Sequence, residues 1–113
     1  MTIGAESYGH AVILNLKGDL TEDVLGPLRQ AVDHQLADKQ VIDLVFNLDE
    51  VPFIDSSCLE YLVDLQDSLA ERLGQVRLAR CDVNVRKILE ITRLDSTFEI
   101  FEDLTEAVKA VEA

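Results

Sequence analysis

The sequence predicts an α/β fold, in which a mixed β-sheet combines an N-terminal hairpin with parallel strands and is flanked by about four α-helices. After residue 40, apolar runs of strand length alternate with amphipathic stretches of helical length, which favours right-handed crossovers and a parallel sheet. Before residue 40, two strand-like runs follow each other closely, which is typical of an antiparallel hairpin.

The N-terminal third supplies the hairpin and a first helix. Residues 11–16 form a mostly apolar strand that ends at a Lys17-Gly18 turn, and residues 2–8 contain a weaker strand. A loop then leads to Pro27, which suits the first helical turn because its missing N–H needs no partner there. The side chains expected to face inward from this helix are Leu28, Ala31, Val32 and Leu36.

The most informative segment is residues 51–59. It follows residues 41–48, an apolar run rich in branched and aromatic side chains that reads as a strand buried on both faces. It opens an amphipathic helix with Asp55 or Ser56 as N-cap and Gly74 as C-terminal cap. The apolar face of this helix follows three-and-four spacing, through Leu59, Leu62, Val63, Leu65, Leu69 and Leu73.

Ser57 falls within the first turn of this predicted helix. Backbone N–H groups lack helical partners there and the helix dipole is positive, so a phosphate on Ser57 would be stabilised locally. Ser57 shows no sign of nucleophilic catalysis, because no Gly-x-Ser-x-Gly elbow surrounds it and neither histidine is placed to act as its base. We therefore expect no catalytic residue.

The C-terminal part continues the alternation. A strand at residues 76–79 leads to a helix capped by Asp82, and a last strand at residues 98–101 leads to a helix opened by Asp103 and Glu106 at capping-box spacing. Since the carboxyl ends of parallel strands share one edge, Asp82 should lie on the same edge as the Ser57 loop. The inward side chains of these helices are expected to be Val85, Ile88, Leu89, Ala107, Val108 and Val111.

In this order, the motifs resemble a STAS domain of the anti-sigma factor antagonist type. The resemblance is carried by Asp55-Ser56-Ser57 after Phe53-Ile54, by residues 17–20 upstream and by residues 85–94 downstream. It covers nearly all of the chain, so we expect a single STAS domain over residues 1–113. The resemblance implies that Ser57, the second serine, is phosphorylated by a partner anti-sigma factor that is also a serine kinase.

The resemblance further implies a bacterial regulator rather than an enzyme, present as a monomer or weak homodimer. Without phosphate it would bind the kinase and free a sigma factor for transcription; phosphorylation would weaken binding and a serine phosphatase would reset the switch.

Cys58 stands where the family usually has glycine. The residues expected to contact the partner are Asp19, Asp55, Ser56, Ser57, Cys58, Glu60 and Tyr61.

Three alternatives stay open at this point. The chain could be the STAS subunit of a phospholipid-transport ABC complex, which would dock on an ATPase. It could be a nucleotide-binding STAS domain, although the sequence has no Gly-rich phosphate loop and ATP is expected to belong to the kinase. It could also be a structural subunit of a larger signalling assembly.

Composition narrows the function classes. Ten Lys and Arg against twenty-two Asp and Glu give the 113 residues a formal charge of −12, and no basic cluster suits direct nucleic-acid binding. No apolar stretch reaches bilayer length and the N-terminus lacks a secretory pattern, so we expect no membrane insertion and a cytoplasmic location.

Cysteine and histidine are few. Two cysteines and two histidines offer no metal-ligand spacing, so we expect no metal, no cofactor and two free thiols. Cys58 is expected to be the more reactive thiol because it lies near a helix N-terminus, whereas Cys81 reads as a core residue at a strand end.

Overall fold

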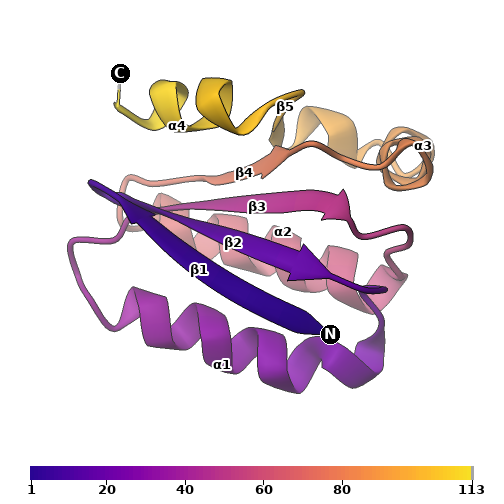
Figure 1. Ribbon diagram of the computed structural model, residues 1–113, viewed down its shortest axis with the longest axis horizontal. Helices are drawn as coiled ribbons and strands as arrows, with labels where there is room; N and C mark the ends of the chain where they lie inside the picture. Colours follow the sequence, from indigo (N-terminus) through magenta and orange to yellow (C-terminus); the bar gives the residue numbers. More distant parts are fainter. Residues whose placement is uncertain (113) are drawn as a thin grey trace.

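A computed structural model describes residues 1–112, and side-chain burial is described for residues 1–109. Its centre is a five-stranded sheet in the order β1-β2-β3-β4-β5, in which β1 and β2 are antiparallel and the later neighbours are parallel (Figure 1). The predicted fold class is confirmed. The strands are β1 (Thr2–Tyr8), β2 (Ala11–Lys17), β3 (Asp43–Glu50), β4 (Val76–Ala79) and β5 (Glu99–Phe101); the helices are α1 (Leu25–Leu36), α2 (Ser56–Ala70), α3 (Val83–Ile91) and α4 (Leu104–Glu112).

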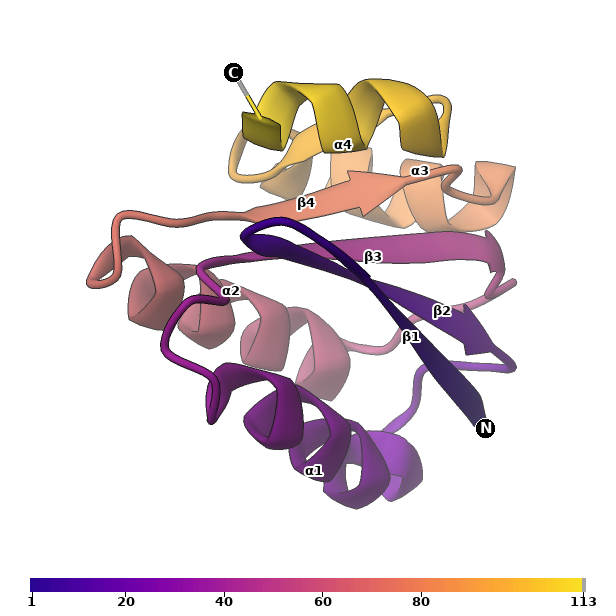
Figure 2. The ribbon, with the colours of Figure 1, turned by 60° about the vertical axis from the view of Figure 1, so that its left-hand side comes forward.

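Helices cover the sheet unequally. Figure 2 shows α1 and α2 below the sheet and α4 above it. The larger core lies on the side of α1, α2 and α3, where alternate residues of β2, β3 and β4 such as Leu14, Phe46 and Leu78 are buried. On the opposite face a smaller cluster joins Ile13, Val45 and Ala79 to Ala107 of α4. The strand predicted to be buried on both faces, β3, is therefore confirmed.

A buried ion pair lies on the α4 side of the sheet, and sequence analysis did not identify it. Asp43 of β3 and Arg77 of β4 are each 6% exposed, and Arg77 Nη1 donates to Asp43 Oδ1 at 3.3 Å. The same carboxylate oxygen accepts the backbone N–H of Gln75 at 2.8 Å. Arg77 Nε lies 3.6 Å from an oxygen of Glu99, whose side chain is half exposed. Each buried charge is thus partnered, which low-dielectric surroundings require.

The first helix starts earlier than the sequence indicated. A 3₁₀ turn at Glu22–Val24 runs directly into α1 at Leu25, so Pro27 is its third residue. Proline is tolerated there because the first helical N–H groups have no intrahelical partner. Of the four side chains predicted to face inward, Leu28 and Val32 are buried and the other two are half buried.

The end of α2 corrects two expectations. Leu73, predicted on the apolar face, is 90% exposed and adopts a left-handed conformation with φ 65°. The N–H groups of Leu73 and Gly74 donate to the carbonyls of Ala70 and Leu69, which is a Schellman motif with leucine at the left-handed position. Gly74 is required for a different reason, because a Cβ there would lie 1.7 Å from the Ile42 carbonyl oxygen.

The remaining helices largely follow their predicted patterns. Asp82 caps α3 by accepting the N–H of Asn84, and Asp103 accepts the N–H of Glu106 at 2.8 Å as the predicted cap of α4. Val85, Leu89 and Ala107 are buried as expected. The side chain of Val111, also predicted to face inward, lies outside the described residues.

A substitution at Leu62 tests how α2 is held on the sheet. Its side chain is 1% exposed in the larger core. Leu62→Ala should lower the free energy of unfolding by about 2 to 5 kcal/mol, because it leaves a cavity beneath the helix. Urea unfolding measures this, with Val63→Ala as the control at a half-buried neighbour. Equal losses for the two variants would show that the buried face of α2 is misassigned.

Candidate functional site

The candidate site lies where two loops run side by side at the carboxyl edge of the sheet. Leu20, in the β2–α1 loop, forms an isolated parallel bridge with Ile54 in the β3–α2 loop. Its N–H donates to the carbonyl of Phe53 and its own carbonyl accepts the N–H of Asp55, each at 2.9 Å. The pairing brings Asp19, which is exposed and directly precedes Leu20, close to the start of α2.

Asp55 joins the two loops through its side chain. It is the N-cap of α2, and its Oδ1 accepts the backbone N–H of Cys58 at 2.9 Å. Its Oδ2 accepts the backbone N–H of Glu22 from the other loop at 2.8 Å. These N–H donors, that of Cys58 foremost, outweigh partial burial and lower the pKa of Asp55 below its ordinary value. Asp55 is therefore a fixed negative charge at neutral pH.

Ser57 is the second residue of α2 and is half exposed, whereas Ser56 before it and Glu60 one turn later are exposed. Within the described residues, neither serine hydroxyl makes a hydrogen bond. Ser57 is therefore a partly exposed residue whose hydroxyl is not used by the hydrogen bonds of the described part of the fold. A phosphate on it would meet two opposing effects, namely the positive end of the helix dipole and the Asp55 carboxylate.

Two residues expected to contact a partner lie in the core instead. Cys58 is fully buried, and Tyr61 is 7% exposed beneath Arg29, whose guanidinium carbon lies 4.6 Å from the ring centroid. Neither side chain offers enough surface for a direct contact, which corrects the expectation. The helical spacing of the sequence indicates this burial, because Cys58 lies four residues before Leu62 and Tyr61 lies four residues before Leu65, and both leucines are on the buried face. Cys58 and Tyr61 therefore pack on the core side of α2, beneath its exposed face.

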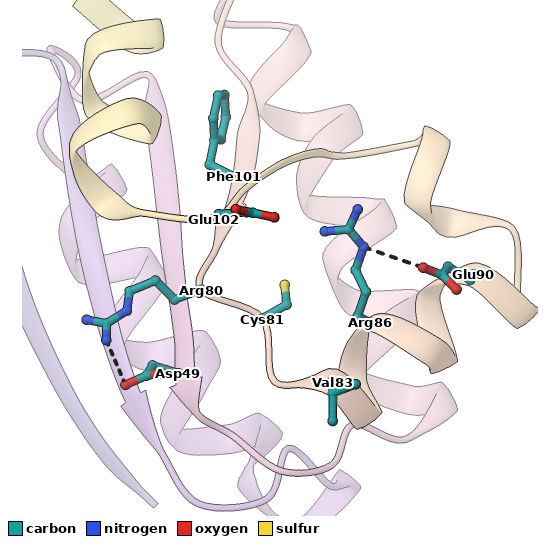
Figure 3. A pocket seen from close by; sticks show the side chains of 8 residues that line it. All are labelled: Asp49, Arg80, Cys81, Val83, Arg86, Glu90, Phe101 and Glu102. Atoms are coloured by element: carbon teal, nitrogen blue, oxygen red, sulfur yellow. Dashed lines mark ion pairs between the residues drawn. The ribbon is translucent and has the colours of Figure 1, made fainter.

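A second group of side chains lines a cavity farther along the same edge. The β4–α3 turn carries Arg80, Cys81 and the N-cap Asp82, and because β3 and β4 are parallel it lies on the edge predicted for Asp82. Figure 3 shows Cys81 and Arg86 directed into the cavity while Arg80 reaches back to Asp49. The cavity has a volume of about 540 Å³ and is lined by Asp49, Arg80, Cys81, Val83, Arg86, Glu90, Phe101 and Glu102.

Both arginines in this cavity are already paired with carboxylates. An Arg80 nitrogen lies 3.2 Å from Asp49, and Arg86 Nε lies 3.7 Å from Glu90. Neither arginine was singled out from the sequence. The i,i+4 spacing of Arg86 and Glu90 is a local signal for one pair, whereas only the register of β3 against β4 brings Asp49 near Arg80. None of the residues that line the cavity belongs to the β3–α2 loop or to α2.

The burial of the two thiols favours the opposite order of reactivity from the one predicted. Burial, followed by the charge of Asp55, raises the pKa of Cys58 to about 12, which outweighs any lowering by the helix N-terminus. Burial raises the pKa of Cys81 to about 11, with Arg86 acting in the opposite direction. Cys81 is half buried and lines the cavity, so it is the more accessible thiol.

A thiol reagent applied to the native protein should therefore modify Cys81 before Cys58. Because both pKa values lie far above 7, labelling of Cys81 should accelerate about tenfold per pH unit between pH 7 and 9. Mass spectrometry of Cys58→Ser and Cys81→Ser variants assigns each rate. Faster labelling in Cys81→Ser than in Cys58→Ser would contradict this order.

Asp55 should contribute to stability in a pH-dependent way. Asp55→Ala removes the N-cap and the bond to Glu22, and should cost about 1 to 2 kcal/mol at neutral pH. Asp55→Asn keeps a cap acceptor but has no titrating group. The folded-state pKa is lowered, so the carboxylate stabilises the fold above its unfolded pKa of about 4 and loses this as pH falls through the folded value.

The advantage of wild type over Asp55→Asn should therefore shrink as urea unfolding is repeated from about pH 6 down to about pH 3. A constant difference across this range would show that the charge of Asp55 is not what holds the two loops.

No helix among residues 1–112 is both long and apolar enough to span a bilayer. In the same described part of the chain, His, Cys, Asp and Glu side chains form no group of three or more suited to a metal ion.

Comparison with known proteins places this geometry in a family. An anti-sigma F factor antagonist from Paenibacillus polymyxa is 25% identical over 99% of this chain and 96% of its own. The structure of an anti-sigma factor antagonist from Mycobacterium paratuberculosis superposes with a TM-score of 0.86, at 25% identity over 99% of this chain and 94% of the other. The phosphorylated form of SpoIIAA, a Bacillus cell fate determinant, superposes with a TM-score of 0.75, at 19% identity over 97% of this chain and 99% of the other. The STAS domain model matches residues 2–107, so this chain belongs to the STAS domain family.

Proposed function

We propose that this protein is an anti-sigma factor antagonist whose binding to a kinase-type anti-sigma factor is switched by phosphorylation of Ser57. The observation that carries the proposal is the Ser57 hydroxyl, half exposed in the first turn of α2 and free of hydrogen bonds among the described residues. Two of the relatives above are named anti-sigma factor antagonists, and a third was solved in a phosphorylated form. These names support the proposal.

The partner surface follows from what is exposed around Ser57. Asp19, Ser56 and Glu60 offer polar contacts, and Phe53 in the β3–α2 loop is 44% exposed beside them. An exposed aromatic ring beside a polar rim is typical of an interface anchor. With Asp55 these residues make the edge acidic, which favours a partner that presents basic side chains.

Phosphorylation would act on this surface mainly through charge. The backbone around Ser57 is held by the Leu20–Ile54 bridge and by the two bonds that Asp55 accepts, so a large rearrangement has little room. A phosphate would add about −1.5 to −2 charges beside Asp55. In a bound complex this charge would be desolvated next to a carboxylate, which weakens association without unfolding the helix.

The chain would be the substrate of the kinase rather than a catalyst. The partner kinase would supply ATP and the catalytic base, and a serine phosphatase would restore the binding form. A regulator of sigma factor availability would act in the cytoplasm, where the transcription machinery and ATP are found.

Replacing the acceptor tests the proposal. Ser57→Ala should remain folded and bind the anti-sigma factor constitutively, whereas Ser57→Asp should bind at least about tenfold more weakly because it adds charge beside Asp55. Ser56→Ala is the matched control, one residue away and more exposed. Protein purified from its native cells should gain about 80 Da on one residue, which peptide mapping should place at Ser57.

Several outcomes would count against this function. Phosphate on Ser56, or Ser57→Asp binding as tightly as wild type, would reject the switch at Ser57. Capture of a lipid-transport ATPase in place of a kinase would favour the ABC-complex alternative, and tight binding of GTP or ATP in isothermal titration would favour the nucleotide-binding one.

A further inference from the structure

The outer edge of β1 is unusually open. Six of its seven residues are exposed, and only Ile3 is half buried. The strand contains no proline and no lysine, its ladder with β2 is regular over all seven pairs, and its single charge is Glu6. Proteins normally protect long edge strands with charges, proline, bulges or a covering element. The edge of β1 has almost none of these devices.

The neighbouring helices leave this edge accessible from both faces. Ala5 and Ser7 point to the side of α1, since they pair with the buried Leu14 and Val12, and yet both are exposed. Glu6 points to the side of α4 and is also exposed. The opposite edge differs, because β5 has only three residues, one of them the charged Glu99.

Gly4 is not explained by the fold of one molecule. It lies in mid-strand, is not among the glycines with positive φ, and a Cβ built on it would meet no atom within 4 Å. Glycine weakens a strand interior and often marks a place where another chain approaches closely. Gly4 leaves a notch above Asn15, its partner on β2.

We propose that the β1 edge pairs with the β1 edge of a second copy, antiparallel, about a twofold axis through Ala5. In this register Gly4 faces Glu6 of the second copy, Ile3 faces Ser7, and Thr2 faces Tyr8. The single charge of each strand then enters the notch over Gly4 of the other, on the side of Asn15. The two five-stranded sheets become one continuous sheet.

The pattern of side-chain sizes favours a second copy over an unrelated peptide. The only charged side chain on β1 lies off the twofold axis and faces a residue without a side chain, so the two Glu6 carboxylates are diagonal neighbours and do not stand directly opposite each other. Small residues occupy the centre of the pairing and the bulky Tyr8 meets the small Thr2 at each end. The larger side chains of each strand therefore lie opposite small residues of the other strand.

The rest of the molecule makes this dimer weak and salt-dependent. Each copy carries a formal charge of −12, so two copies repel at long range and added salt should strengthen association by screening. Pairing along one seven-residue strand buries less than a standard interface, which points to micromolar rather than nanomolar affinity.

Analytical ultracentrifugation of the full chain from about 5 to 500 μM tests this, at about 50 mM and about 500 mM NaCl. Association should tighten at the higher salt. Ala5→Lys puts two lysines face to face at the axis and should raise the dimer dissociation constant at least about tenfold. Thr97→Lys, an exposed position just before β5, adds the same charge near the other edge and should leave or improve dimerisation by reducing net charge.

Gly4→Thr separates the proposed interface from folding. A Cβ at this position meets no atom within 4 Å and threonine favours strands, so the monomer should unfold at an equal or higher urea concentration while the filled notch weakens dimerisation. A monomer at all concentrations in high salt, or a dimer that tolerates both Ala5→Lys and Gly4→Thr, would overturn the proposal.

Discussion

The candidate site depends on the carboxylate of Asp55. One of its oxygens accepts the N–H of Cys58 and so starts α2, while the other accepts the N–H of Glu22 and so holds the β2–α1 loop against the helix. Without this link the two loops would be joined only by backbone bonds around Leu20. A neutral side chain could accept the same bonds, but a carboxylate does so more strongly, because hydrogen bonds to a charged acceptor are the stronger ones.

The Asp55 carboxylate that holds the two loops together would also repel a phosphate placed on Ser57. Asp55, which starts the helix that carries Ser57, is itself a negative charge at neutral pH, because the N–H groups that donate to it lower its pKa. A modified helix start would therefore combine dipole stabilisation with carboxylate repulsion, and the net effect on folding should be small. The effect on a partner would be larger, because binding removes the water that screens the two charges. Under the proposed function, the rigidity of the site and the binding switch would thus have the same structural origin.

The sequence predicted those features that depend on local pattern. Alternating strand and helix periods identified every strand and α-helix but neither 3₁₀ turn, and cap residues such as Asp55, Asp82 and Asp103 located three helix starts. The features that the sequence did not predict depend on contacts between residues that are distant in the chain. Nothing near Gly74 indicates that Ile42 lies against it, and nothing near Asp43 indicates that Arg77 will be its partner. The motif placed Cys58 among the expected partner contacts, whereas its helical spacing places it in the core, where it is fully buried.

The two proposed interfaces are compatible because they lie on different parts of the sheet. The Ser57 loop is at the carboxyl ends of β2 and β3, whereas the β1 edge runs along the side of the sheet. In an antiparallel pairing of two β1 strands, the carboxyl edges of the two sheets point in opposite directions, so neither copy covers the Ser57 of the other. A dimer could then bind two partners at once, and its avidity would depend on whether those partners are themselves linked. Phosphorylation would act directly on the first interface and would reach the second only through the added net charge of each copy, because Glu6, the only charge on β1, lies outside the Ser57 edge.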